Sequence, residues 1–216
     1  MPSSRPRRSP TPQERQRDPE RTRQRILDAA TVEFAEHGFA GARTRAIATR
    51  AGVNQQLVSY YFGGKEGLYR AMSERWQQRR AELAPAGASL PEQLRAYALE
   101  ALRSPEGVRM FAWSGLQYSG PDEDPDRESR TRMLQGGTAE LRALQAEGRL
   151  PAEVDPACLQ VILMAACMAT TTLPHVIEGL CGADPRSAEF IEHFADQVAI
   201  VARLIGLDGG AGTAPR

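Results

Sequence analysis

The sequence predicts an all-α protein, and three observations support that prediction. Alanine is abundant and β-branched residues are not, a composition that favours helices over sheets. No segment alternates apolar and polar residues as a half-buried strand would. Apolar residues recur instead at helical spacing, between breaks rich in Gly, Pro, Ser and Asp. We therefore expect an N-terminal domain of three helices followed by a larger helical domain.

The first helix is expected to begin at Asp18. Residues 1–17 contain four prolines and five arginines without apolar periodicity, which predicts a disordered basic tail. The following Asp18-Pro19-Glu20 provides an N-cap residue, a proline at the first helical position and an acid in the first turn. Gly38 is the expected end, after an apolar face formed by Ile26, Leu27, Ala30 and Phe34.

Two short helices are expected next. Thr44 is the expected N-cap of a helix over 45–51, and Asn54 caps a third helix over 55–62 that ends at Gly63-Gly64. Two short helices joined by a tight turn with a glycine are typical of a helix-turn-helix, whose second helix can enter the major groove of DNA. Residues 18–66 are therefore expected to form a DNA-binding domain.

A longer helix is expected to open at Lys65, and residues 67–207 are expected to form the second domain. Its first helix carries one apolar stripe of Leu68, Met72, Trp76 and Leu83. Residues 86–89 predict a linker, and residues 208–216 predict a flexible tail. The remaining helices are expected at 90–103, 105–118, 126–147, 156–179 and 187–206.

The net charge of zero conceals an asymmetry along the chain. Residues 1–80 carry 16 basic and 8 acidic side chains, whereas residues 81–216 carry 11 and 19. Such an asymmetry indicates that the first part meets a polyanion, with a solvated arginine-rich face as the alternative. The chain starts without a signal-peptide pattern, and its longest apolar run, 161–169, is too short to span a bilayer. We therefore expect a cytoplasmic protein with no membrane contact.

The outward face of the third helix contains the candidate DNA-reading residues. Val58 and Phe62 are four residues apart and are expected to point inward, which leaves an outward face of Gln55, Gln56, Ser59 and Tyr60. A side-chain amide at the start of such a helix can pair with N6 and N7 of adenine. The two adjacent glutamines are therefore candidates for base reading.

Contacts to the DNA backbone are expected beside this face. Tyr60 and Tyr61 can donate their hydroxyl protons to phosphate oxygens. Lys65, the only lysine of the chain, stands at a helix N-terminus, where the dipole and the charge both attract phosphate. Each of these residues alone is more commonly surface or half-buried core, and only the ordered set is specific.

This ordered set resembles a known signature. The segment TRAIATRAGVNQQLVSYYFGGKEGLYRAM, residues 44–72, is similar to the DNA-binding signature of the TetR/AcrR family of bacterial transcriptional regulators. The matching features are Thr44, Ile47-Ala48, Ala51-Gly52-Val53, Tyr60, Phe62, Lys65-Glu66 and Leu68. The preceding helix, with His37-Gly38-Phe39 at its end, fits the family's first helix. The later segment GRLPAEVDP resembles the loop before the family's eighth helix.

The resemblance implies a ligand-responsive transcriptional regulator that binds a palindromic double-stranded DNA operator. By analogy with the family we expect a repressor that is released from the operator by a small, largely apolar molecule. The DNA contacts that it implies are Thr44, Arg45, Gln55, Gln56, Ser59, Tyr60, Tyr61 and Lys65. Ser59 and Tyr61 stand where the family commonly has tyrosine and histidine. The arginines of the N-terminal tail either reach DNA as well or remain solvated.

The C-terminal domain is expected to bind the ligand and to form a homodimer. The segment 158–169 is apolar on nearly every side, and the last helix carries a repeating apolar stripe. The resemblance implies an intersubunit four-helix interface, with an intramolecular core as the alternative. The residues expected at this dimer interface are Val161, Phe190, Phe194, Val198 and Val201. The expected ligand pocket is lined by Trp76, Tyr97, Phe111, Trp113, Gln117, Met164, Met168 and His175.

An enzyme and a helical adapter are the rival interpretations. The histidines, His37, His175 and His193, have no metal-ligand spacing, and the chain lacks GxSxG, P-loop and GxGxxG motifs. We therefore expect no catalysis, no metal and no cofactor. A helical adapter would leave the charge asymmetry and the lysine at a helix N-terminus unexplained.

Overall fold

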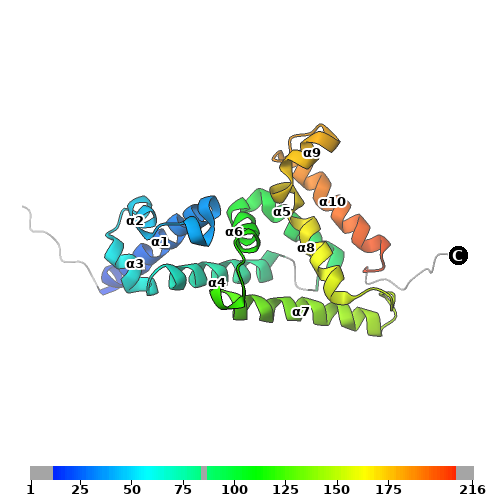
Figure 1. Cartoon of the computed structure of the whole chain (residues 1–216), viewed down its shortest axis with the longest axis horizontal. Helices are drawn as coiled ribbons and strands as arrows, with labels where there is room; N and C mark the ends of the chain where they lie inside the picture. The colour runs from blue at the N-terminus through cyan, green and yellow to red at the C-terminus, as the bar shows by residue number, and fades with distance from the viewer. Residues whose placement is uncertain (1–11, 84–86, 208–216) are drawn as a thin grey trace, which may run out of the picture.

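The computed structural model describes residues 12–83 and 87–207. Within those ranges all regular structure is helical, as predicted (Figure 1). The elements are α1 (Pro12–Gly41), α2 (Thr44–Ala51), α3 (Gln55–Phe62), α4 (Lys65–Leu83), α5 (Leu90–Arg103), α6 (Pro105–Leu116), a short 3₁₀ helix (Pro121–Glu123), α7 (Arg127–Ala146), α8 (Pro156–Thr172), α9 (Pro174–Cys181) and α10 (Ala188–Leu204). In Figure 1, α1–α3 lie at the left, α6 stands in the middle, and α5 and α8–α10 lie at the right. α4 runs from the left-hand group toward the right, and α7 continues to the right below it.

The first helix begins earlier than the sequence predicts. The prediction of a disordered tail is wrong for residues 12–17, which are helical, and its residues 1–11 lie outside the described part. Pro12 suits the first position of a helix, and the Gln, Glu and Arg residues after it are good helix formers. Pro19 therefore lies inside α1, where it cannot donate a backbone hydrogen bond. Gly38 interrupts the helix as expected, with a φ of 66°.

The helix-turn-helix is formed by α2 and α3. Thr44 is the first residue of α2 rather than its N-cap, because its hydroxyl accepts a hydrogen bond from Gln55 and Arg43 occupies the cap position. Gly52 ends α2 in the left-handed conformation, with a φ of 63°. Asn54 caps α3 as predicted, since its side chain accepts the N–H of Gln56 at 2.9 Å.

A buried core holds these helices against the start of α4. Its fully buried side chains come from all four helices and include Ile26, Phe34, Ile47, Val58 and Leu68. The ring of Tyr69 packs edge-on against Phe34, with 5.2 Å between the centroids. Because Val58 faces this core, the opposite face of α3 is left to solvent.

The C-terminal helices pack around a second core. α10 lies along α5, and α8 packs against both. The buried residues of this second core include Leu94, Leu141, Leu163, Ile191 and Ala195. The expected single helix over 156–179 is wrong, because α8 and α9 meet at a bend of 82°. Pro174 causes the break, since it lacks an N–H and its ring clashes with the preceding helical turn.

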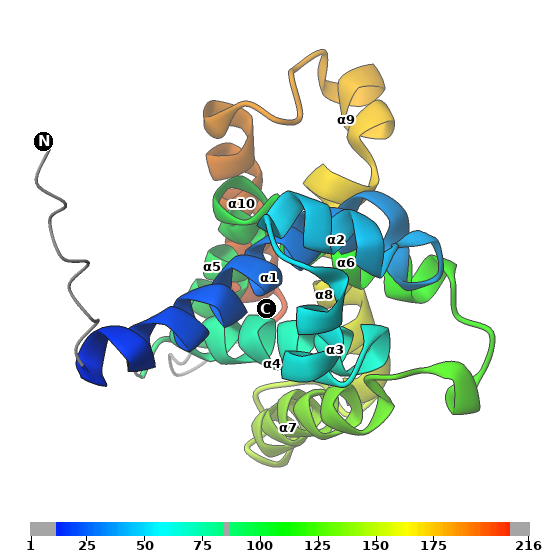
Figure 2. The same cartoon turned by 90° about the vertical axis from the view of Figure 1, so that its left-hand side faces the viewer.

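Two helices connect the two cores. The first turns of α4 belong to the N-terminal core through Tyr69 and Met72, and its later turns reach the C-terminal helices. α6 packs along α1, and Nε1 of Trp113 donates to the carbonyl oxygen of Ala35 at 3.2 Å. Figure 2 shows α2 and α3 together at the end of the molecule that faces the viewer. The solvent-exposed face of α3 thus lies at one end of the molecule, opposite α8 and α10 (Figure 1).

Candidate nucleic-acid interface and ligand cavity

The exposed face of α3 presents the predicted reading residues. Gln55, Gln56 and Ser59 are exposed, and Tyr60 is 80% exposed. Nε2 of Gln55 donates to the hydroxyl of Thr44 at 2.9 Å, which ties the first turn of α3 to the first turn of α2. The structure therefore brings Thr44 and Gln55 together on one surface. Arg45 is exposed beside Thr44.

Tyr60 and Tyr61 have different surroundings. Their rings meet edge-on, with 5.2 Å between the centroids. Tyr61 is half-buried and packs against the N-terminal core, whereas the side chain of Tyr60 stands in solvent. Tyr60 is thus the freer of the two to meet a phosphate, and Tyr61 also fixes α3 on its core.

Lys65 is engaged within the chain. Its Nζ donates to the carbonyl oxygen of Ala40 at 3.1 Å and lies 4.9 Å from the centroid of the Phe39 ring. Partial burial lowers the pKa of Lys65, and the Glu33 carboxylate opposes that shift. An ammonium group has three donors, so two remain for a phosphate while the first holds α1.

A cavity of about 320 Å³ lies among α4, α5, α6, α7 and α8. The rings of Trp76 and Phe111 stack in its wall, with 5.8 Å between their centroids. The predicted residues that line the cavity are Trp76, Tyr97, Phe111, Met164 and Met168. The volume and the largely apolar wall suit a small organic ligand.

Three predicted pocket residues lie elsewhere. Trp113 points to α1 and bonds Ala35, so it does not line the cavity. Gln117 also faces α1, where its Oε1 accepts the N–H of Ala40 at 3.0 Å and its Nε2 donates to the carbonyl of His37 at 3.3 Å. His175 lies past the bend at Pro174, which carries it onto α9. Their assignment to the pocket is therefore wrong.

Polar residues of the cavity wall escaped the sequence analysis. They include Glu100, Glu140 and Gln160. Glu100 is 2% exposed, and its Oε1 accepts the Nε–H of Arg79 at 2.6 Å. The sequence did contain a signal for Glu100. It follows Tyr97 by three residues and therefore lies on the same inward face of the helix.

The predicted dimer residues divide into two groups. Val161 of α8 and Val201 of α10 are 66% and 53% exposed, as an interface requires. Phe190 and Phe194 are half-buried, with stacked rings 6.1 Å apart. Val198 is buried in the core of its own chain, because α10 turns that face toward α5, so its assignment to the dimer surface is wrong. Ile162 and Leu204 are exposed apolar residues that the sequence analysis missed.

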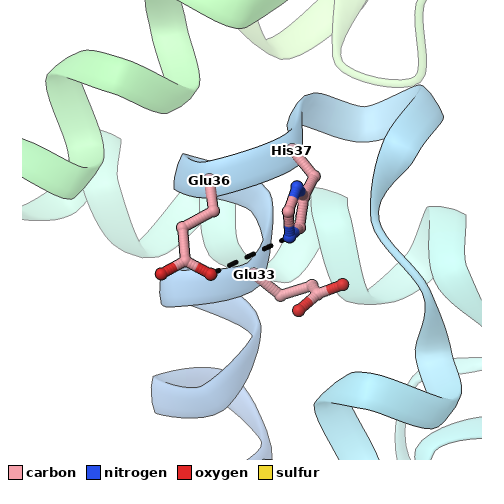
Figure 3. A group of neighbouring side chains, drawn as sticks. All are labelled: Glu33, Glu36 and His37. Atoms are coloured by element: carbon pink, nitrogen blue, oxygen red, sulfur yellow. Dashed lines mark ion pairs between the residues drawn. The ribbon is translucent and has the colours of Figure 1, made fainter.

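One group of possible metal ligands occurs among the described residues. Oxygen and nitrogen atoms of Glu33, Glu36 and His37 lie within 4.8 Å of one another (Figure 3). Glu36 forms ion pairs with Arg50 at 3.2 Å and with His37 at 3.9 Å. The buried Glu33 accepts the backbone N–H of Arg43 at 3.1 Å, which fixes the loop between α1 and α2. These contacts account for all three side chains, and we assign no metal to them.

The chain matches two family models. Residues 26–72 match bacterial regulatory proteins of the tetR family, and residues 89–198 match a tetracyclin repressor-like C-terminal domain. The chain is 31% identical over 170 residues to the HTH-type transcriptional repressor SCO4008 of Streptomyces coelicolor, over 77% of this chain and 86% of that protein. It belongs to the TetR family. It is therefore a bacterial transcriptional regulator with a DNA-binding helix-turn-helix and a helical effector domain.

Other relatives of this TetR-family regulator support the same assignment. It is 28% identical over 182 residues to the regulator RutR of Escherichia coli K12, over 80% of this chain and 84% of RutR. The crystal structure of the transcriptional regulator SCO4942 of Streptomyces coelicolor superposes with a TM-score of 0.68 at 27% identity, over 87% of this chain and 99% of that one. AibR in complex with isovaleryl coenzyme A and operator DNA shares the fold, with a TM-score of 0.63 at 18% identity, over 86% and 98%.

No single helix of the described ranges is long and apolar enough to cross a membrane. The sharply bent pair of α8 and α9 reaches that length and composition only when its two helices are taken together.

Proposed function

We propose that this regulator is a repressor that binds a palindromic operator as a homodimer and leaves it when a small molecule fills the cavity. The observation that carries the DNA-binding role is the exposed face of α3, where Gln55 and Gln56 begin the helix and Thr44 orients Gln55. Amides at the start of such a helix read base edges, and the neighbouring Tyr60 and Lys65 contact phosphates.

The proposed dimer uses the outward faces of α8 and α10. Val161 and Ile162 on α8, and Val201 and Leu204 on α10, expose apolar surface at the end of the molecule away from α3. A second copy would cover that surface and place a second α3 on the DNA. Two reading helices must then sit about 34 Å apart, or a multiple of that distance, to meet successive major grooves.

The proposed release runs through α4 and α6. Trp76 of α4 and Phe111 of α6 form part of the cavity wall. The same α4 enters the N-terminal core at Met72. Gln117, which caps the end of α6, forms hydrogen bonds with His37 and Ala40 on either side of the Gly38 bend of α1. A ligand that moves either helix therefore moves the helix-turn-helix. A preference of about 2.7 kcal/mol for the non-binding form lowers operator affinity about a hundredfold.

The test starts from the purified protein and random DNA. Selection of bound duplexes should return a palindrome with two half-sites, and a titration against ionic strength should show a steep loss of affinity with salt. A monomer bound to a single half-site would contradict the dimer. Binding with equal affinity to every sequence would contradict the reading role of α3.

A further inference from the structure

The described residues that line the cavity include acidic side chains but no basic ones. Of its described lining residues, Glu100 and Glu140 are acidic, and none is Lys, Arg or His. The rest are mainly aliphatic residues, methionines and aromatics. A ligand bearing a carboxylate or a phosphate would therefore lose its hydration without meeting a cation in the wall.

Glu100, a residue of this wall, has one buried carboxylate oxygen without a hydrogen-bond partner among the described residues. Its Oε1 is occupied by Arg79, whose guanidinium reaches it from the half-exposed side of α4. Its Oε2 is buried and has no hydrogen-bond partner among the described residues. A buried polar atom left unpaired costs about 1–3 kcal/mol, and more when it is charged. A ligand N–H that meets Oε2 would recover that cost.

The glutamines of the wall differ from Glu100, because each of them forms a hydrogen bond within the protein through at least one atom of its amide. Oε1 of Gln77 accepts the hydroxyl proton of Ser129 at 2.9 Å, and Nε2 of Gln93 donates to the carbonyl of Ala88 at 3.0 Å. Nε2 of Gln160 donates to the carbonyl of Leu134 at 3.0 Å. Oε2 of Glu100, in contrast, is buried without a hydrogen-bond partner among the described residues, so we infer the polar group of a ligand from it.

We propose that the cavity binds an aromatic molecule carrying a protonated amine, whose N–H donates to Oε2 of Glu100. The stacked rings of Trp76 and Phe111 provide the flat apolar surface for its ring system, and aromatic faces also attract cations. This assignment rests on the proposed function, in which the same cavity receives the effector.

The test compares two probes of the same three-ring shape and opposite charge. 9-Aminoacridine is a cation with amine N–H donors at pH 7, and 9-anthracenecarboxylate is an anion. Fluorescence titration of the protein alone, without DNA, should show binding of 9-aminoacridine at least about tenfold tighter than binding of the anion. DNA is left out because a flat aromatic cation also stacks between base pairs.

Glu100→Gln is the decisive variant, since it keeps the shape of the side chain and removes the carboxylate. It should weaken 9-aminoacridine about tenfold and leave the anion unchanged or bound more tightly. Glu178→Gln, which alters an exposed carboxylate of α9 outside the cavity, should change neither affinity. Thermal melting of each variant checks that it is folded.

The ratio of the two affinities decides the outcome. Equal binding of both probes by the wild type, or an unchanged ratio in Glu100→Gln, would overturn the proposal, including the case in which both affinities fall together. Operator selection tests the DNA-binding role on its own. A cavity that does not bind the amine would therefore contradict the proposed ligand class but not the proposed role as a repressor.

Discussion

Across the turn between α2 and α3, the hydroxyl of Thr44 orients the side chain of Gln55, for which we propose a base-reading role. The Thr44 hydroxyl accepts a hydrogen bond from Gln55, so a residue of the first helix orients a residue of the second. Fixing a free glutamine costs up to about 2 kcal/mol of rotamer entropy, and orientation before binding reduces that cost. Lys65 acts in a similar way, because its contacts with Ala40 and Phe39 hold the ammonium near α3 before DNA arrives.

Gln55→Ala should weaken binding of the selected operator by about 1–3 kcal/mol and relax the preference at one base pair per half-site. Thr44→Val should reproduce part of that relaxation, because it removes the acceptor that orients Gln55. Thr49→Val is the matched control, since the hydroxyl of Thr49 bonds only within α2, to the carbonyl of Arg45. Titrations on operators with single base changes measure the effect. A Gln55→Ala variant that lost affinity equally for every sequence would contradict base reading.

Lys65→Ala should weaken binding of operator and random DNA alike. Two phosphate contacts are lost in the dimer, so the slope of log K against log salt should become shallower by roughly 2. The variant also loses the bond to Ala40, which should lower the free energy of unfolding by about 1 kcal/mol. Salt titrations and thermal melts measure the two effects separately. A changed base preference with an unchanged salt slope would mean that the roles of Lys65 and Gln55 are reversed.

At the scale of elements, α4 is fixed to its surroundings on several sides. Tyr69 packs between Phe34 and Phe39 of α1, and the hydroxyl of Ser73 donates to the carboxylate of Asp126 ahead of α7. Burial raises the pKa of Asp126, although the Ser73 hydrogen bond opposes that shift. The beginning of α4 therefore moves only together with α1 and α7.

The tyrosine at this junction predicts an alkaline transition. Burial raises the pKa of Tyr69 from 10.0 to about 12, and the Asp126 carboxylate adds to the effect. An acid whose pKa is higher in the folded than in the unfolded state holds its proton more tightly in the folded state. The contribution of Tyr69 to the free energy of unfolding is therefore complete below pH 10 and is lost as the pH rises toward 12. The loss should reach about 3 kcal/mol. Tyr69→Phe should remove this loss in melts taken from pH 9 to 12, and a variant as alkali-sensitive as the wild type would contradict the assignment.

The close approach of the first turn of α4 to the end of α3 depends on Gly67. A Cβ at this position would collide with the backbone carbonyl of Phe62, the last residue of the reading helix. Gly67→Ala should therefore lower the melting temperature by several degrees, about 1–3 kcal/mol of stability, and weaken operator binding as α3 shifts. Gly136→Ala on α7 is the matched control, because a Cβ there meets open space, and it should be neutral or slightly stabilising. Equal melting temperatures of the two variants would contradict the role of Gly67.

The end of α2, both ends of α3 and the solvent-exposed face of α3 could be predicted because their signals are local, whereas the start of α1 and the break between α8 and α9 were predicted wrongly. Asn54, Gly52 and Gly63 act on the backbone within one turn, and the structure confirms each of them. The cavity could not be predicted in the same way. Helical spacing shows that Gln117 and Glu100 lie on particular faces, but the packing of distant helices decides that Gln117 meets α1 and that Glu100 meets the cavity.

At the scale of the whole molecule, the proposed dimer surface and the reading face occupy opposite ends (Figure 1). Exposed apolar residues gather on α8 and α10, while the basic N-terminal part carries the helix-turn-helix. A dimer formed at one end fixes the separation of the two reading helices at the other. Disruption of that surface should therefore abolish operator binding although it leaves α3 untouched.

The double variant Val161→Glu and Leu204→Glu should be folded and monomeric, because both side chains are exposed within one chain. Light scattering at micromolar concentration measures its mass, and a mobility shift measures the loss of the operator complex. Val198→Glu is the contrast, since a charge placed in the core of the chain should lower the melting temperature sharply. A double variant that remained dimeric would show that another surface joins the subunits.

The continuity of α4 has a consequence for anyone who would recombine this regulator with its relatives. Met72 belongs to the core beneath the reading helix and Trp76 belongs to the cavity wall, and the two are neighbours on one face of the same helix. α4 therefore joins the cavity to the DNA-binding domain directly, without a linker between them. A chimera that joins this C-terminal domain to the DNA-binding domain of a relative must therefore be joined within a single turn of α4. The junction must also keep the helical register of α4. One inserted or deleted residue would rotate the sensor by about 100° relative to the operator.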